Sequence, residues 1–105
     1  MPILVKDDPE PTGKTIFVTT RWKVNARCAR WWNNATPHKP IMAVYPKDSS
    51  PTDERVQYKP NTKLEVYQDA IKTDGGIEYL AIKGTYSKYK PYTLYVKKSD
   101  TKKIG

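Results

Sequence analysis

The chain has very few of the residues on which thiol and metal chemistry depend. Cys28 is its single cysteine and His38 is its single histidine. One cysteine excludes an internal disulfide and a multi-cysteine zinc site, and one histidine excludes a cluster built from several. We therefore expect neither a metal ion nor another cofactor.

Long apolar segments are also missing. Apolar residues make up 37% of the chain, and no window approaches the roughly 18 apolar residues that a membrane span needs. The first residues, MPILVKDDPEPTGK, lack the extended apolar core of a secretory signal. We expect no signal peptide and no membrane insertion, and a virion or the cytoplasm of a host cell stays open as the location.

Groups for catalysis are scarce. The one possible thiol pair joins Cys28 to His38, yet His38 lies in a proline-flanked, loop-forming stretch. We interpret Cys28 as a small buried apolar residue and His38 as a solvated loop residue. The acids that could form a catalytic carboxylate pair all lie in turn-forming sequence, where acids commonly cap turns and keep a protein soluble. These acids are Asp48, Asp53, Glu54 and Asp74. The sequence thus predicts a protein that is not an enzyme.

What the chain does have is alternating β-type sequence, clearest between Leu64 and Ile82. Leu64 and Val66 fall on one face, and Leu80 alternates with its neighbours in a second run. The turn Thr73-Asp74-Gly75-Gly76 supplies the positive φ angles that a tight hairpin requires. This segment predicts a β-hairpin.

Further short strands are expected on both sides of the hairpin. Nine prolines limit the length of strands and helices. Trp22, Val24 and Ala26 alternate and should share a face, whereas the adjacent Trp31 and Trp32 favour a short helical turn that buries one of them. The remaining strands are predicted at 15–20, 22–27, 41–45, 55–58 and 93–97. The chain is therefore expected to be all-β, with an exposed N-terminal arm at 1–14, a domain at 15–98 and a fraying charged tail at 99–105.

The net charge of +8 is unevenly distributed. Residues 11–47 carry seven basic residues and no acid, and residues 79–99 carry five lysines and no acid. Residues 48–78 between them have four basic and seven acidic residues. If the two acid-free stretches meet in space, they form a positive face suited to a polyanion; the alternative is that these lysines only keep the domain soluble.

Several stretches together resemble bacterial SH3-like domains. Val24-Asn25-Ala26-Arg27 resembles their opening strand, Val56 to Val66 their strand-turn-strand step, Asp74 to Ile82 their distal hairpin and Thr93-Leu94-Tyr95-Val96 their closing strand. The resemblance implies a small antiparallel SH3-like barrel with long ordered loops. It also implies binding of bacterial cell-wall peptides or glycans, as in the targeting modules of phage and bacterial lysins.

Two basic, aromatic loops are the candidate binding site. Aromatic planes beside cationic groups suit sugar rings, peptides or bases. The first loop follows the opening strand, and the second, rich in tyrosine and lysine, precedes the last strand. The alternative is that one tryptophan plugs the barrel end and the tyrosines brace a long loop. The predicted ligand-binding residues are Arg27, Arg30, Trp31, Trp32, Tyr86, Lys88, Tyr89, Lys90 and Tyr92.

Three functions remain open at this point. The first is a module, of a kind that phages encode, that binds a cell-wall polymer or a host surface, which the resemblance favours. The second is a single-stranded nucleic-acid binder, which the pI of about 9.6 and the interleaved aromatics favour. The third is a virion component or an inhibitor with a protein partner. Salt dependence distinguishes the second from the others.

Overall fold

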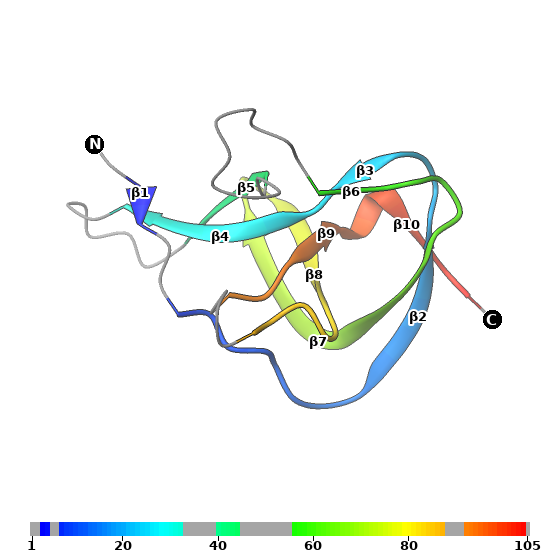
Figure 1. Ribbon diagram of the computed structural model, residues 1–105, viewed down its shortest axis with the longest axis horizontal. Helices are drawn as coiled ribbons and strands as arrows, with labels where there is room; N and C mark the ends of the chain where they lie inside the picture. The colour runs from blue at the N-terminus through cyan, green and yellow to red at the C-terminus, as the bar shows by residue number, and fades with distance from the viewer. Residues whose placement is uncertain (1–2, 5–6, 33–39, 45–55, 88–91, 105) are drawn as a thin grey trace.

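The computed structural model describes residues 3–4, 7–32, 40–44, 56–87 and 92–104, with only the backbone described at 3–4 and 31–32. These residues form ten β-strands and one 3₁₀ turn, and the described part of the chain contains no α-helix (Figure 1). The all-β prediction is confirmed. The elements are β1 Ile3–Leu4, β2 Thr15–Thr20, β3 Val24–Asn25, β4 Arg27–Trp32, β5 Ile41–Val44, β6 Gln57–Tyr58, β7 Lys63–Asp74, β8 Ile77–Ile82, β9 Tyr95–Lys97, η1 Lys98–Asp100 and β10 Thr101–Lys103.

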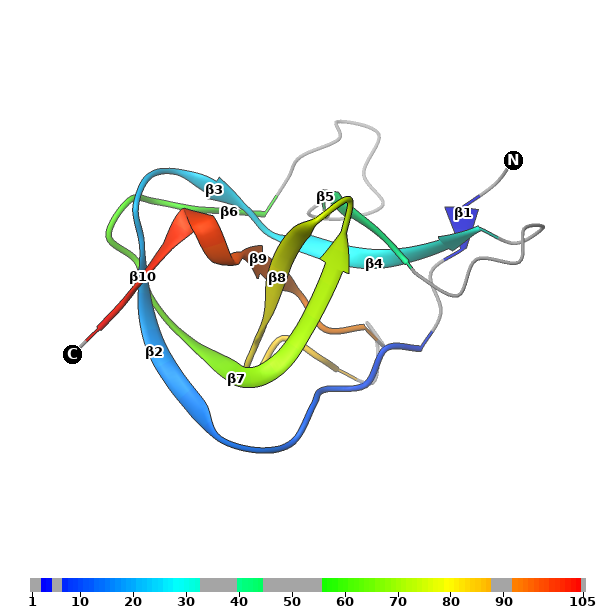
Figure 2. The same ribbon diagram turned by 180° about the vertical axis from the view of Figure 1, so that it is seen from behind.

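Eight of the strands form one antiparallel sheet. Its order is β1-β4-β9-β8-β7-β2-β10, with β5 added beside β4. The remaining strands, β3 and β6, pair separately. The large sheet curls in the manner of a small barrel but does not close among the described strands, because β1 and β10 end its order (Figures 1 and 2).

The predicted hairpin is present as β7 and β8. Gly75 and Gly76 form the two-residue turn at φ 60° and 83°, the positive angles that a type I′ connection requires. Farther along the strands, four residues of β7 (67–70) stand opposite one residue of β8, Ala81. A bulge of this kind bends the strand that carries it, and β7 is visibly curved in Figure 2. The hairpin thus supplies the curvature of the sheet.

Two neighbouring clusters form the centre of the core. The first is aliphatic and consists of Val18, Val24, Leu64, Val66, Leu80, Ile82 and Val96. The second contains three tyrosines and consists of Ala29, Met42, Tyr67, Tyr79, Ala81 and Tyr95. Strand β8 is buried on both faces from Tyr79 to Ile82, because Leu80 and Ile82 belong to the first cluster while Tyr79 and Ala81 belong to the second. One-sided alternation was predicted there.

Several strand predictions need correction. The predicted strand 22–27 is divided: β3 pairs with β6, while β4 starts at Arg27 and joins the large sheet. Val24 and Ala26 are buried as predicted, but Trp22 is 54% exposed because the chain bends at 21–22 and turns its side chain outward. The predicted strand 41–45 is present as β5, and its Tyr45 lies outside the described residues.

Both ends of the chain pack more firmly than predicted. The tail at 99–105 was expected to fray, yet β10 pairs with β2 from Thr101 to Lys103. The arm at 1–14 was expected to be exposed, yet β1 pairs with β4 and Asp8 is only 9% exposed. Backbone hydrogen-bonding groups explain both results, because an open sheet leaves strand edges that further strands can pair.

The N-terminal acids contact tyrosine hydroxyl groups. The hydroxyl of buried Tyr95 donates to the Asp8 carboxylate at 2.8 Å, and the Lys72 ammonium lies 3.4 Å from the same carboxylate. The hydroxyl of Tyr67 donates to Glu10. Acidic side chains therefore satisfy polar groups that a tyrosine-containing core would otherwise bury unpaired.

We expect Tyr95→Phe to lower the free energy of unfolding by about 1–3 kcal/mol, because Asp8 loses its buried hydroxyl donor. Tyr86→Phe is the matched control, since its hydroxyl donates to Asp7 at 3.0 Å in an exposed pair. That change should cost less than about 0.5 kcal/mol. Urea unfolding of both variants measures the difference, and equal losses would contradict a structural role for the buried pair.

Candidate binding surfaces

Strand β4 carries the two predicted arginines on opposite faces. Arg27 lies on the side of the tyrosine cluster, with its guanidinium 6.0 Å from the centre of the Tyr79 ring. Arg30 lies on the other side, near Cys28, where burial raises the pKa of the thiol and the charge of Arg30 lowers it in part. Residues three apart on a strand point in opposite directions. The side chains of Arg27 and Arg30 therefore do not line one shared binding site.

The two adjacent tryptophans do not form the predicted helical turn. Trp31 and Trp32 extend β4, and their backbones pair with Leu4 and Ile3 of β1. The backbone at these two positions is extended rather than helical.

The described tyrosines of the predicted second loop contact the body of the protein. Tyr86 is half-buried, and its hydroxyl is bound to Asp7. Tyr92 packs against the small cluster of Ala26 and Cys28. Lys88, Tyr89 and Lys90 lie outside the described residues. Tyr86 and Tyr92 thus serve in part as structural braces, the alternative considered from the sequence.

The candidate catalytic groups have structural roles where they are described. Cys28 is fully buried, and burial raises the pKa of its thiol, which Arg30 only partly offsets. Asp74 accepts a hydrogen bond from the Met42 backbone N–H at 2.9 Å. His38, Asp48, Asp53 and Glu54 lie outside the described residues. Within the described residues, no group of three or more His, Cys, Asp or Glu side chains could hold a metal ion.

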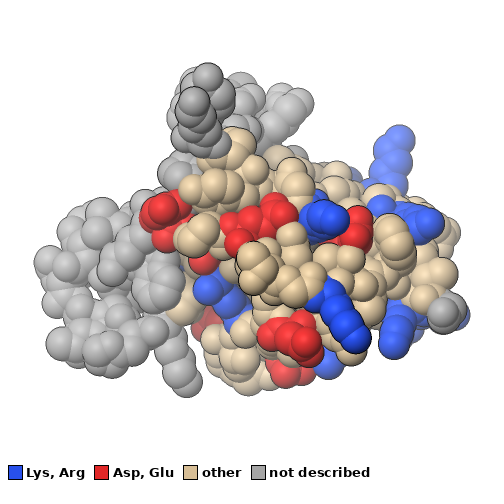
Figure 3. Space-filling model, turned by 90° about the horizontal axis from the view of Figure 1, so that it is seen from below, with Lys and Arg blue, Asp and Glu red and all other residues tan. Residues whose placement is uncertain are grey.

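A different surface gathers the positive charge. Strand β2 pairs with β10 on one side and with β7 on the other, which joins residues 17–23, 59–63 and 97–104. We call these three segments the basic end. They contain eight lysines and arginines and one acid, Asp100. Their net charge of +7 is nearly the whole charge of the chain, and Figure 3 shows blue side chains toward the end where β2 and β10 lie.

The strand register places cations in a row at the basic end. Thr19 on β2 pairs with Lys102 on one side and with Lys63 on the other. Cross-strand partners share a face of the sheet, so the two lysines flank Thr19 on the outer face. Lys23, Lys59 and Lys103 are also exposed, and none of these five lysines has an ion pair with a described acid.

Two aromatic side chains lie exposed beside these cations. Phe17 is 44% exposed on the outer face of β2, and the Lys63 ammonium lies 4.5 Å from the centre of its ring. Trp22 is held by its indole N–H, which donates to Asp100 at 3.1 Å. The basic end therefore combines cations with exposed rings.

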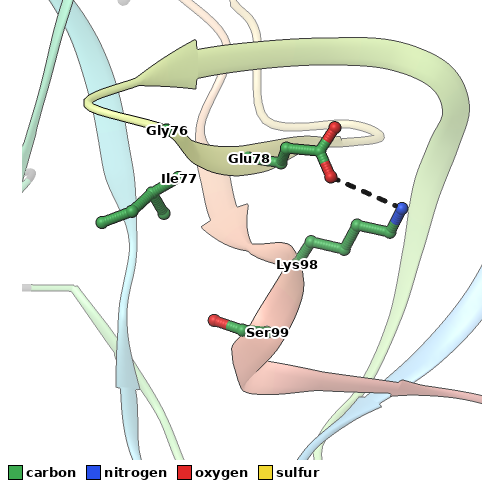
Figure 4. A pocket seen from close by; sticks show the side chains of 5 residues that line it. All are labelled: Gly76, Ile77, Glu78, Lys98 and Ser99. Atoms are coloured by element: carbon green, nitrogen blue, oxygen red, sulfur yellow. Dashed lines mark ion pairs between the residues drawn. The ribbon is translucent and has the colours of Figure 1, made fainter.

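A shallow hollow of about 340 Å³ lies next to the basic end. Its lining comes from Gly76, the start of β8 and η1, and Figure 4 shows Glu78 and Lys98 pointing toward each other across it. Their charged atoms are 3.7 Å apart. The two charges neutralise one another, which leaves the Ser99 hydroxyl as the uncharged polar group of the lining.

No protein-family model, curated protein sequence or solved structure matches this chain. In the described part of the molecule, no helix has the length and apolar character to cross a membrane. The SH3-like resemblance therefore stays a prediction, and the binding surfaces are argued from their own geometry.

The sequence reasoning missed the basic end. Two of its segments belong to the acid-free stretches or adjoin them, but 59–63 lies in the stretch that is acidic overall. One signal was available in the sequence: the aromatic residues Phe17 and Trp22 lie close to two cations, Arg21 and Lys23. The pairing of β10 with β2 could not be read from a segment expected to fray.

The acid–tyrosine contacts predict loss of stability in alkali. The hydrogen bond from Tyr67 to Glu10 raises the pKa of Tyr67 to about 12. Burial and the nearby Asp8 carboxylate raise the pKa of Tyr95. Unfolded tyrosines lose their proton near pH 10. Because the folded pKa values are higher, the stability contribution is complete below about pH 10 and is lost as the pH rises through about 12.

We expect the free energy of unfolding to fall over this pH interval and to fall less steeply in Tyr67→Phe. Urea unfolding at a series of pH values, with tyrosinate absorbance as a second signal, measures this. Parallel curves for the two proteins would contradict the assignment.

Proposed function

We propose that this protein is a non-enzymatic binding module that holds an anionic linear polymer on its basic end. The observation that carries the proposal is the concentration of a net +7 in three segments brought together by β2. Lysines on β10 and β7, on either side of β2, suit contacts with several anions of one chain better than one enclosed anion. The buried, inert thiol of Cys28 is consistent with binding rather than catalysis.

The physical basis is the release of counterions. A polymer with closely spaced anions condenses cations around itself, and each lysine that replaces one of them releases it to solution. Binding by this route weakens steeply with salt. Adjacent strands lie about 4.8 Å apart. Lys63 and Lys102 lie on either side of β2, so about two strand spacings, roughly 10 Å, separate them across the sheet. They can therefore contact separate anions along one polymer.

We expect Lys63→Ser combined with Lys102→Ser to weaken polymer binding and to make its logarithmic salt dependence shallower by about 1 to 2. Fluorescence anisotropy with labelled oligothymidylate and long-chain polyphosphate, at several salt concentrations, measures both quantities. Lys14→Ser combined with Lys83→Ser is the charge-matched control, because both lysines are exposed and lie outside the basic end. Equal weakening by the two double variants would argue against a localised site.

A second candidate function is recognition of a bacterial cell-wall peptide or glycan at the rim that the two predicted basic, aromatic loops would form together. Arg30 lies near Cys28, and Tyr92 packs against the small cluster of Ala26 and Cys28. One residue from each predicted loop is therefore found near this cluster. Both are only partly buried. This convergence favours the rim over either loop alone.

For this candidate we expect the protein to sediment with purified cell walls. Trp32→Ala or Tyr89→Ala should reduce the bound fraction with little loss of thermal stability. Failure to sediment would exclude this function, and unfolding of both variants would assign these aromatics to the core.

A further inference from the structure

We infer that the polymer bound by the basic end is a single-stranded nucleic acid whose bases stack on Phe17 and Trp22. This inference rests on the proposed function, because the same lysines supply the phosphate contacts. It adds a contact that most other anionic polymers cannot make, since every base offers a flat face to an aromatic ring.

The distribution of aromatic residues is the first observation. Phenylalanine is among the residues most often fully buried, whereas tyrosine is intermediate because of its hydroxyl group. This chain reverses that order. Tyr67, Tyr79 and Tyr95 are buried in the core, while Phe17 and Trp22 are 44% and 54% exposed. Alternation along β2 turns Phe17 outward, and the bend at 21–22 turns Trp22 outward. Both rings thereby lie beside the cations of the basic end, where a ligand can reach them.

The surroundings of Phe17 are the second observation. Lys63 lies over its ring, and exposed Ile104 is adjacent, because the Ile104 N–H donates to the Phe17 carbonyl. A phosphate paired with Lys63 would draw the ammonium from the ring and make the ring available to the neighbouring base. Cation and aromatic are thus arranged for the two parts of one nucleotide.

Trp22 is fixed in place before any ligand binds. Its only polar group, the indole N–H, is already bound to Asp100, and the Arg21 Nε–H beside it donates to the Thr101 carbonyl at 3.1 Å. A ring that is held in advance loses little side-chain entropy on binding. The indole is therefore suited to stacking rather than to hydrogen bonding with a base.

The spacing of the two rings favours a single strand. Five residues separate Phe17 from Trp22, which allows at most about 17 Å between them at the rise of a β-strand. A flexible strand can cross such a distance with its bases turned outward, and small β domains of this type cover about 4 to 16 nucleotides. In a duplex the bases are already stacked and paired, so only its phosphates would remain available.

The test compares four polymers by anisotropy at equal salt: oligothymidylate, a duplex of the same length, long-chain polyphosphate and heparin. We expect oligothymidylate to bind at least about tenfold more tightly than the others, as one stacked base requires.

Phe17→Leu and Trp22→Leu should each weaken oligothymidylate binding by about 5- to 100-fold. Phe17→Tyr and Trp22→Phe should retain most of it, and Ile71→Ala, which alters an exposed apolar residue on β7, should have no effect.

The dependence of affinity on salt concentration distinguishes this inference from the proposed function. The leucine variants should lower affinity without changing the salt slope, whereas Lys63→Ser with Lys102→Ser should change the slope. Equal binding of polyphosphate or duplex, with the leucine variants unchanged, would overturn the stacking inference and leave polymer binding intact. Binding to none of the four polymers at low salt would overturn both. Thermal melts of each variant identify any loss of affinity caused by unfolding.

Discussion

The pairing of buried tyrosine hydroxyls with N-terminal carboxylates is the interaction on which much of the structure depends. The chain is only 37% apolar and completes its core with tyrosines. Each buried hydroxyl needs a partner, and Asp8 and Glu10 provide partners for Tyr95 and Tyr67. A segment that looks like a polar linker thereby becomes part of the core. This pairing fixes β7 and β9 relative to the N-terminal segment.

Strand β2 organises the other half of the molecule. Its inner face contributes Val18 and Thr20 to the interior, while its outer face presents Phe17 and Thr19. Pairing on both sides brings lysines from β7 and β10 next to that outer face. Charges that repel one another are tolerated there because they are exposed and screened by solvent. One strand therefore builds both the aliphatic core and the basic end.

The predicted arginines do not share one face of the sheet. Arg30 lies near Cys28, whereas Arg27 packs toward Tyr79 on the opposite face of β4. Successive side chains along a strand alternate between its faces, which separates Arg27 from Arg30. The sequence had predicted a loop from this point, and a loop has no such alternation. The basic end has a simpler origin, because its cations are neighbours through strand register rather than through sequence.

Local sequence alone determined the β class, the hairpin with its Gly75-Gly76 turn and the burial of Cys28, because alternation, positive φ and small apolar character act over a few residues. It also identified β2 and β5 as strands. Only the tertiary structure decided that the tail becomes β10, that Asp8 is buried and that Trp22 turns outward. These outcomes depend on which strand edge or hydroxyl group lies within reach. Pairing between residues about 80 positions apart leaves no periodic signal in either segment, so the basic end appears only once the chain is folded.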